Sequence, residues 1–247
     1  MKRLAVLSLV ASLVLSACAP PDGPVVAAPP AGVFPVLRAD AGPPPDVTTA
    51  ARNFVSVVRR MEPVIREECR MRARPGTNCD FRIVVDDRRG QPPNAYQTLA
   101  PDGAPIIAFT IPLIADARNV DELAFILGHE AAHHIRGHIP RQKETAMAGA
   151  LILGGLVAAS GGDPAAVRSA QDFGATVGAR TYSKEFELEA DDLGTVLAWQ
   201  AGYDPLRGAA FFTRIPDPGN QFLGSHPPNA ERIAVVRAAV ARLQAGG

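Results

Sequence analysis

The sequence predicts an α+β domain that is mostly helical, with a small β-sheet early in the chain. Helical spacing of apolar residues dominates from residue 119 onward, whereas strand-like runs gather between residues 81 and 111. Hydrophobic residues make up 47% of the chain, enough for a sizeable core, while aromatic residues make up only 6%. Abundant alanine and glycine therefore indicate helices that pack closely through small side chains.

The first 17 residues have the pattern of a secretory signal peptide. Two basic residues precede an apolar run, Leu4 to Leu15, that is too short to span a bilayer as a mature helix. The run ends in LSAC, which resembles a bacterial lipobox, so we expect a lipid anchor on Cys18. An ordinary signal peptide cleaved nearby, with Cys18 incidental, is the alternative. In the lipoproteins that this signal resembles, an Asp at the position of Ala19 favours the inner membrane, so the resemblance implies the periplasmic face of the outer membrane.

A tether is expected between this anchor and one folded domain. Residues 19–46 contain nine of the 23 prolines, and such a stretch cannot bury a core. We therefore assign residues 18–46 to the lipidated cysteine and tether, and residues 47–247 to the domain. Basic and acidic residues balance at 25 each, so no broad positive field indicates nucleic acid as a partner.

The other two cysteines, Cys69 and Cys79, form an even pair in a chain expected to be exported. An oxidising compartment favours a disulfide, and the sequence RPGTN between them supplies a turn. Two free buried thiols are the alternative. A zinc role is not expected for this pair, because no second Cys or His pair lies nearby.

The domain is expected to begin with a helix and a small sheet. Helical spacing predicts a helix over residues 47–72, which Pro63 should kink or divide. The β-branched run FRIVVDD, residues 81–87, predicts a strand. The sequence NAYQTLAPDGAPIIAFTI, residues 94–111, predicts two strands around a PDG turn.

A well-marked helix follows, because Asn119 is a good N-cap and Glu122 sits three residues later, as in a capping box. We expect this helix to run through residue 138 and to end before Pro140. Residues 146–159 are apolar but too short to span a bilayer, so we expect a buried helix; a membrane-dipping or substrate-facing segment is the alternative. Further helices are predicted near residues 144–159, 164–179, 183–201, 205–213 and 228–243.

Four of the five histidines lie in GHEAAHHIRGH, residues 128–138. Within it, His129, Glu130 and His133 form the pattern H-E-x-x-H. Residues four apart lie on one helix face, so two imidazoles can hold one Zn²⁺ while the glutamate reaches a water at the metal. A histidine-rich surface helix without chemistry is the alternative, and a third ligand is needed to decide against it.

The run SKEFELEADDLG supplies three candidates for the third ligand: Glu185, Glu187 and Glu189. In sites of the gluzincin type, the ligand glutamate is followed four residues later by an aspartate that bonds a ligand histidine. Glu187 has Asp191 at this spacing, so we expect Glu187 to bind the metal and Asp191 to orient His129. A solvated acidic helix face is the alternative.

Taken together, these motifs resemble those of a known protein family. ELAFILGHEAAHHIRGH together with YSKEFELEADDLG resembles the HtpX- and BepA-like zinc metallopeptidases, which are gluzincins related to the CAAX prenyl proteases. NAYQTL, AGYDP and SHPPNAERI are similar to further family motifs in the same order. The resemblance covers about residues 50–240 and indicates a short, single-domain lipoprotein member. It implies His129, His133 and Glu187 as ligands of one Zn²⁺, and Glu130 as the general base.

The resemblance also implies roles for residues outside this core set. His226, in the His-Pro motif, is expected to be a regulatory fourth ligand; a transition-state hydrogen-bond donor or a structural residue are the alternatives. Arg232 is expected to anchor this loop or to stabilise developing charge. His138 is expected to have a packing or helix-terminal role, and His134 a structural or surface role.

The expected function is that of a zinc-dependent endopeptidase that degrades unfolded or misassembled envelope proteins. An extended substrate is expected to add to the NAYQTL strand, with Asn94 and Ala95 flanking the cleft through backbone bonds. One rival is a latent protease that acts as a chaperone-like assembly factor for outer-membrane proteins. A structural lipoprotein with a relic site is the other, and the intact ligand set argues against it.

Overall fold

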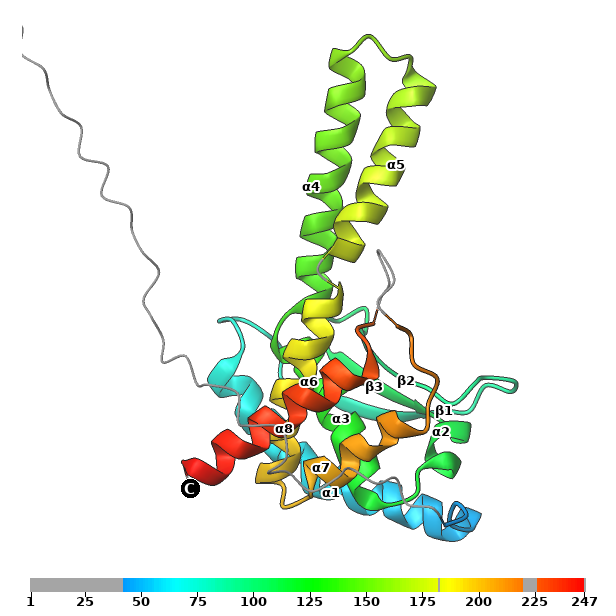
Figure 1. Ribbon diagram of the computed structural model, residues 1–247, viewed down its shortest axis with the longest axis vertical. Coiled ribbons are helices and arrows are strands. Elements are labelled where there is room, and N and C mark those ends of the chain that lie inside the picture. Colours follow the sequence, from blue (N-terminus) through cyan, green and yellow to red (C-terminus); the bar gives the residue numbers. More distant parts are fainter. Residues whose placement is uncertain (1–41, 182, 220–225, 247) are drawn as a thin grey trace, which may run out of the picture.

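The computed structural model describes residues 42–181, 183–219 and 226–246 (Figure 1). These residues form a mostly helical α+β fold with a small sheet early in the chain, which confirms the predicted fold class. The signal peptide, the lipidation of Cys18 and most of the tether are predictions that lie outside the described residues. The described part contains no helix that is both long enough and apolar enough to span a membrane.

Helix α1 (Val47–Arg72) opens the domain, and Asp46 caps it by accepting hydrogen bonds from two backbone amides of the first turn. Pro63 lies inside this helix without dividing it. One face of α1 is buried in the main core. Cys69, at its end, forms a disulfide with Cys79 across a Cα–Cα distance of 5.8 Å, which fastens the following loop to the helix.

The sheet has three strands in the order β1 (Arg82–Asp86), β3 (Pro105–Thr110) and β2 (Ala95–Leu99). β1 runs parallel to β3, and β2 runs antiparallel to it across the predicted PDG turn. The short helix α2 (Ile111–Asp116) follows β3 directly and was not predicted. Its six residues are too few to show a helical period.

Helix α3 (Val120–Ile135) begins at the predicted cap, where Oδ1 of Asn119 accepts from the amide of Glu122. It ends before Pro140 as expected, but the prediction that it runs through residue 138 is wrong, because α3 ends at Ile135 and the chain turns at Gly137. Gly137 has a φ of 67°, a left-handed conformation that glycine adopts without strain. Helix α4 (His138–Ala159) then begins, and Pro140 lies in its first turn, where a missing amide hydrogen costs nothing.

Helices α4 and α5 (Pro164–Thr181) form a hairpin that projects from the body (Figure 1). The prediction of a buried helix over residues 146–159 is wrong, because Gly154 is its only buried residue and most of its larger apolar side chains are exposed. A Cβ on Gly149 would lie 2.1 Å from the carbonyl oxygen of Gly174, so the two backbones are in contact. The exposed side chains of α4 are those of Met147, Leu151, Ile152 and Leu156.

Four helical segments complete the body: α6 (Ser183–Gln200), α7 (Pro205–Ala209), the 3₁₀ turn Ala210–Thr213 and α8 (Asn229–Ala245). α3 packs directly on α6, and their backbones touch at Gly128 and Gly194. A Cβ on Gly128 would lie 2.7 Å from the carbonyl oxygen of Gly194. This close approach brings the H-E-x-x-H helix against the acidic run of α6.

Candidate metal centre

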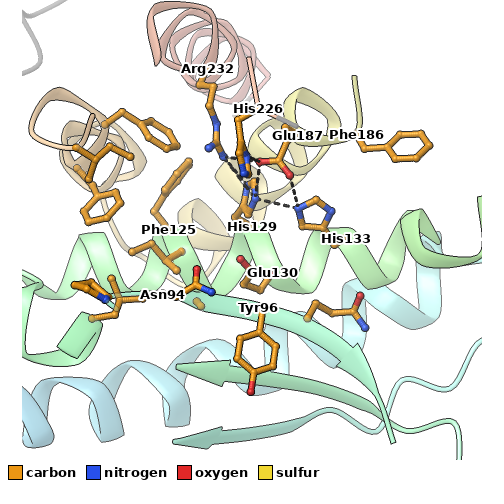
Figure 2. Close-up of a pocket in the computed structure, with 18 of the residues that line it drawn as sticks. Asn94, Tyr96, Phe125, His129, Glu130, His133, Phe186, Glu187, His226 and Arg232 are labelled. Atoms are coloured by element: carbon orange, nitrogen blue, oxygen red, sulfur yellow. Dashed lines mark hydrogen bonds and ion pairs between the residues drawn. The ribbon is translucent and has the colours of Figure 1, made fainter. Parts of the chain in front are cut away.

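Three side chains that could hold a metal ion converge where α3 meets α6. His129 and His133 lie one turn apart on α3, and Glu187 faces them from α6 (Figure 2). Their donor atoms all lie within 4.8 Å of one another. Nε2 of His133 is 3.0 Å from Nε2 of His129 and 3.3 Å from Oε1 of Glu187. Two imidazole nitrogens and one carboxylate oxygen are a donor set that suits zinc, so these residues fit the expected ion.

The ring of His129 is oriented by a buried ion pair. Its Nδ1 lies 2.9 Å from Oδ1 of Asp191, at the spacing that the sequence indicated. Arg232 of α8 holds both oxygens of Asp191, with Nε 2.7 Å from Oδ2 and Nη2 2.8 Å from Oδ1. Because an ionised carboxylate only accepts, Nδ1 of His129 donates to Asp191, which directs Nε2 at the place of the expected ion. Nη2 of Arg232 also lies 3.3 Å from Nδ1 of His129 and 3.5 Å from Oε2 of Glu187, so Arg232 contacts the ligands directly as well as through Asp191, and the sequence did not indicate these contacts.

Within this cluster, hydrogen bonds between oppositely charged side chains outweigh the effect of burial on the pKa values. Burial lowers the pKa of His129, but hydrogen bonds to Asp191 and Glu187 outweigh it and raise that pKa to about 10. Burial raises the pKa of Glu187, but hydrogen bonds to His129 and His133 dominate and hold it well below its usual range. The carboxylate of Glu187 is therefore charged, and a positive charge is favoured beside it.

The ring of His133 is held by a second set of contacts. Its Nδ1 lies 2.8 Å from Nδ1 of His138, the first residue of α4. Nε2 of His138 lies 3.1 Å from Oε2 of Glu189, which Arg141 also bonds at 2.7 Å. The His138 ring is buried and stacks on Phe186, with ring centroids 4.6 Å apart. Burial, followed by the neighbouring His133, lowers the pKa of His138 to about 4, so this ring is neutral at neutral pH.

The two remaining histidines differ in their relation to the metal cluster. His134 points away from it, with Nε2 2.7 Å from the carbonyl oxygen of Asn78 and its ring against the edge of Phe81. His226 lies at the cluster, with Nδ1 3.0 Å from Oε2 of Glu187 and about half of its side chain exposed. His226 thus contacts the side chain of a candidate metal ligand.

A cavity of about 900 Å³ opens beside the cluster and contains Glu130, which is partly exposed (Figure 2). The ligand residues and Glu130 lie on its wall, so a bound peptide could reach both. Near α2 and the 3₁₀ turn the lining includes six apolar residues: Leu113, Phe125, Ile126, Phe211, Phe212 and Ile215. Charged residues, Asp116, Arg118 and Arg214, also line this part, and the rest of the wall includes residues of β2, Ile139 and Phe186.

The strand β2 borders the cavity and, among the described residues, has a strand on only one side. The backbone of Asn94 is bonded to Thr110 through both its amide and its carbonyl, so it cannot also bond a substrate as expected. In an antiparallel pair the bonding direction alternates along the strand. Ala95 and Gln97 therefore direct their backbone groups toward the free edge, and Asn94 presents its side chain to the cavity.

Comparisons with known proteins agree with this geometry. The sequence model of peptidase family M48 matches residues 54–240 of the chain. A protein of Vibrio cholerae serotype O1, named "Putative beta-barrel assembly-enhancing protease", is 32% identical over 115 residues. The similar region covers 42% of this chain and 23% of the relative, so the chain matches less than a quarter of that protein's length.

Proposed function

This chain belongs to peptidase family M48, a family of metallopeptidases, and on that premise we propose that it is a zinc-dependent endopeptidase of the bacterial envelope. The observation that carries the proposal is the convergence of two imidazoles and one carboxylate beside a cavity that also contains the carboxylate of Glu130. That combination supplies a metal site, a proton acceptor and room for a substrate in one place.

His129, His133 and Glu187 would hold the ion, and a fourth position would remain for water or substrate. When bound, zinc would supply a Lewis acid that makes water more acidic and polarises a peptide carbonyl. The chain prepares the two imidazoles for this task through Asp191 and His138, which leave each Nε2 directed at the ion.

Glu130 would move the proton. It follows His129 on α3 and faces the cavity, and the hydrogen bonds described above leave it uncommitted to any of the ligand residues. Its carboxylate would accept a proton from the attacking water and deliver it to the nitrogen of the leaving amine as the C–N bond breaks.

The free edge of β2 would align the substrate. An extended peptide can pair with the backbone of Ala95 and Gln97, while its side chains reach the apolar wall around Phe125 and Phe211. Backbone pairing accepts many sequences but requires an extended, unfolded chain. This supports unfolded or misassembled envelope proteins as substrates.

Three observations support an envelope location. The signal peptide and lipobox of residues 1–18 predict export and anchoring at Cys18, on the periplasmic face of the outer membrane. The disulfide between Cys69 and Cys79 suits an oxidising compartment. The Vibrio relative is named for assembly of β-barrel proteins, which points to the same compartment.

The test uses the lipid-free chain from residue 19 onward, loaded with zinc and mixed with an unfolded model protein. Glu130→Gln should lose at least about 10²-fold in kcat while keeping its zinc, because general-base catalysis is lost and the ligands remain. Glu185→Gln changes an exposed glutamate of α6 in the same way and should cleave like wild type. Equal cleavage by Glu130→Gln and wild type would refute the assignment of Glu130.

A latent protease with a chaperone-like role in outer-membrane assembly is the second candidate. The contact of His226 with Glu187 favours it, because that contact engages a carboxylate oxygen of a proposed metal ligand. If the resting enzyme is held back in this way, His226→Ala should cleave faster than wild type. A cell that depends on assembly rather than cleavage should also tolerate Glu130→Gln in a complementation assay.

A further inference from the structure

On the side that faces away from the expected metal, the ring of His133 is held by a series of side-chain contacts. None of these side chains takes part in the proposed proton transfer to the substrate. Nδ1 of His133 meets Nδ1 of His138, and Nε2 of His138 meets Oε2 of Glu189. Arg141 bonds the same carboxylate and lies over the ring of Phe186 at 4.3 Å, while His138 stacks on that ring. This series of contacts connects α3, the first turn of α4, and α6.

The chemistry of the carboxylate fixes the proton of His138. An ionised carboxylate has no hydrogen to donate, so the 3.1 Å contact with Glu189 requires a proton on Nε2 of His138. A neutral imidazole carries one ring proton, so Nδ1 of His138 then has only a lone pair. His138 therefore presents an acceptor to His133 across their 2.8 Å contact.

The same reasoning then fixes His133. Its Nδ1 must donate to the acceptor on His138, so with the ion bound its proton lies on Nδ1 and its Nε2 offers a lone pair to the ion. That Nε2 is the atom directed at Nε2 of His129 and at Glu187. We infer that His138 and Glu189 are positioning residues that fix the tautomer of His133 and thereby reserve its Nε2 for the metal. The inference rests on the proposed metallopeptidase function and extends it to two further residues.

The two ligand histidines are thus oriented in different ways. His129 meets a carboxylate directly, whereas His133 meets one through an intervening imidazole. The turn at Gly137 makes this possible, because α3 ends at Ile135, two residues after His133, and the turn brings His138 back beside His133. A continuous helix would place position 138 on a different face, 140° around from His133.

The direct test is the protonation of the rings in the zinc-loaded wild-type protein, labelled with ¹⁵N at its five histidines. Protonated and bare ring nitrogens resonate far apart, so each tautomer can be measured rather than assigned from contacts. We expect a proton on Nδ1 of His133, and on Nε2 but not Nδ1 of His138. A proton on Nδ1 of His138 would overturn the inference, whatever the behaviour of any variant.

The second test measures zinc affinity by competition with a chelator. His138→Leu keeps the apolar contact with Phe186 but removes the acceptor, and should weaken zinc binding about 10–100-fold. His138→Asn places an amide oxygen where Nδ1 was and should recover affinity to within about tenfold of wild type. His134→Leu is the matched control, since this neighbouring histidine bonds Asn78 instead, and its zinc affinity should not change.

The outcomes separate the inference from the proposed function. If wild type binds no zinc, the proposed function fails and the inference fails with it. If wild type binds zinc tightly and His138→Leu binds it equally well, only the inference fails. If His138→Asn is as weak as a folded His138→Leu, the loss comes from packing and the positioning role is refuted. Should His138→Leu fail to fold, the tautomer measurement on wild type decides.

Discussion

The contact between α3 and α6 at Gly128 sets the distance between the two halves of the metal centre, and replacing this glycine should test that relation. In Gly128→Ala the new methyl group would lie 2.7 Å from the carbonyl oxygen of Gly194, about 0.7 Å closer than an ordinary contact of 3.4 Å. The obstacle is backbone, which cannot rotate away. The two helices must therefore separate, and Glu187 must move away from His129 and His133.

Two opposing effects decide the change in the free energy of unfolding. Alanine is favoured over glycine inside a helix by about 0.8–1 kcal/mol. Overpacking in a tight interface costs about 1–3 kcal/mol. The net expectation is a destabilisation of about 1 kcal/mol. Gly155→Ala is the matched control, because a Cβ at Gly155 on α4 meets nothing within 4 Å, so only the helical gain remains there.

Urea unfolding of both variants in the metal-free state measures these changes, and zinc affinity measures the displaced ligand. Gly155→Ala should be more stable than wild type by up to about 1 kcal/mol with unchanged zinc affinity, whereas Gly128→Ala should be less stable and bind zinc more weakly. A Gly128→Ala protein as stable as Gly155→Ala, with wild-type zinc affinity, would show that the helix contact does not set the geometry.

Three further predictions concern the same framework. Arg232→Met should lower the free energy of unfolding by about 3 kcal/mol, because it leaves Asp191 buried without its cation; a loss below about 1 kcal/mol in urea unfolding would contradict this. Replacing Cys69 and Cys79 together by serine should lower it by about 2–3 kcal/mol, since the disulfide closes a short loop, and thermal unfolding of oxidised wild type provides the comparison. Removing metal with a chelator should abolish cleavage and zinc should restore it, whereas activity that survives exhaustive chelation would exclude a metallopeptidase mechanism for that cleavage.

Much of the scaffold was predictable because its signals are local. The cap at Asn119 and the turn around Asp102 and Gly103 act within a few residues, and they marked the start of α3 and the β2–β3 hairpin where the structure has them. The candidate ligands were also predictable, since His129 and His133 are spaced by one helical turn. Glu187 could be selected only through its spacing to Asp191.

The features that were missed depend on contacts between distant residues. The end of α3 is set by a left-handed glycine, and glycine at position 137 is compatible with both a helix and a turn until its conformation is known. The apolar run of α4 resembles a core helix, because a periodicity shows which residues share a face but not what covers that face. The contact of His138 with Glu189 spans 51 residues and has no local signal.

The α4–α5 hairpin leaves the body after α3 and returns to it at α6, and those two helices already touch each other. Its length is therefore independent of the distance between the metal ligands. Closing a longer connection costs only about 0.6 kcal/mol for each doubling of its length. Insertions or deletions beyond the first turn of α4 can consequently alter how far the protein reaches while the contact between Arg141 and Glu189 at the base stays intact. The length of the α4–α5 hairpin can therefore change during evolution without a change in the metal centre.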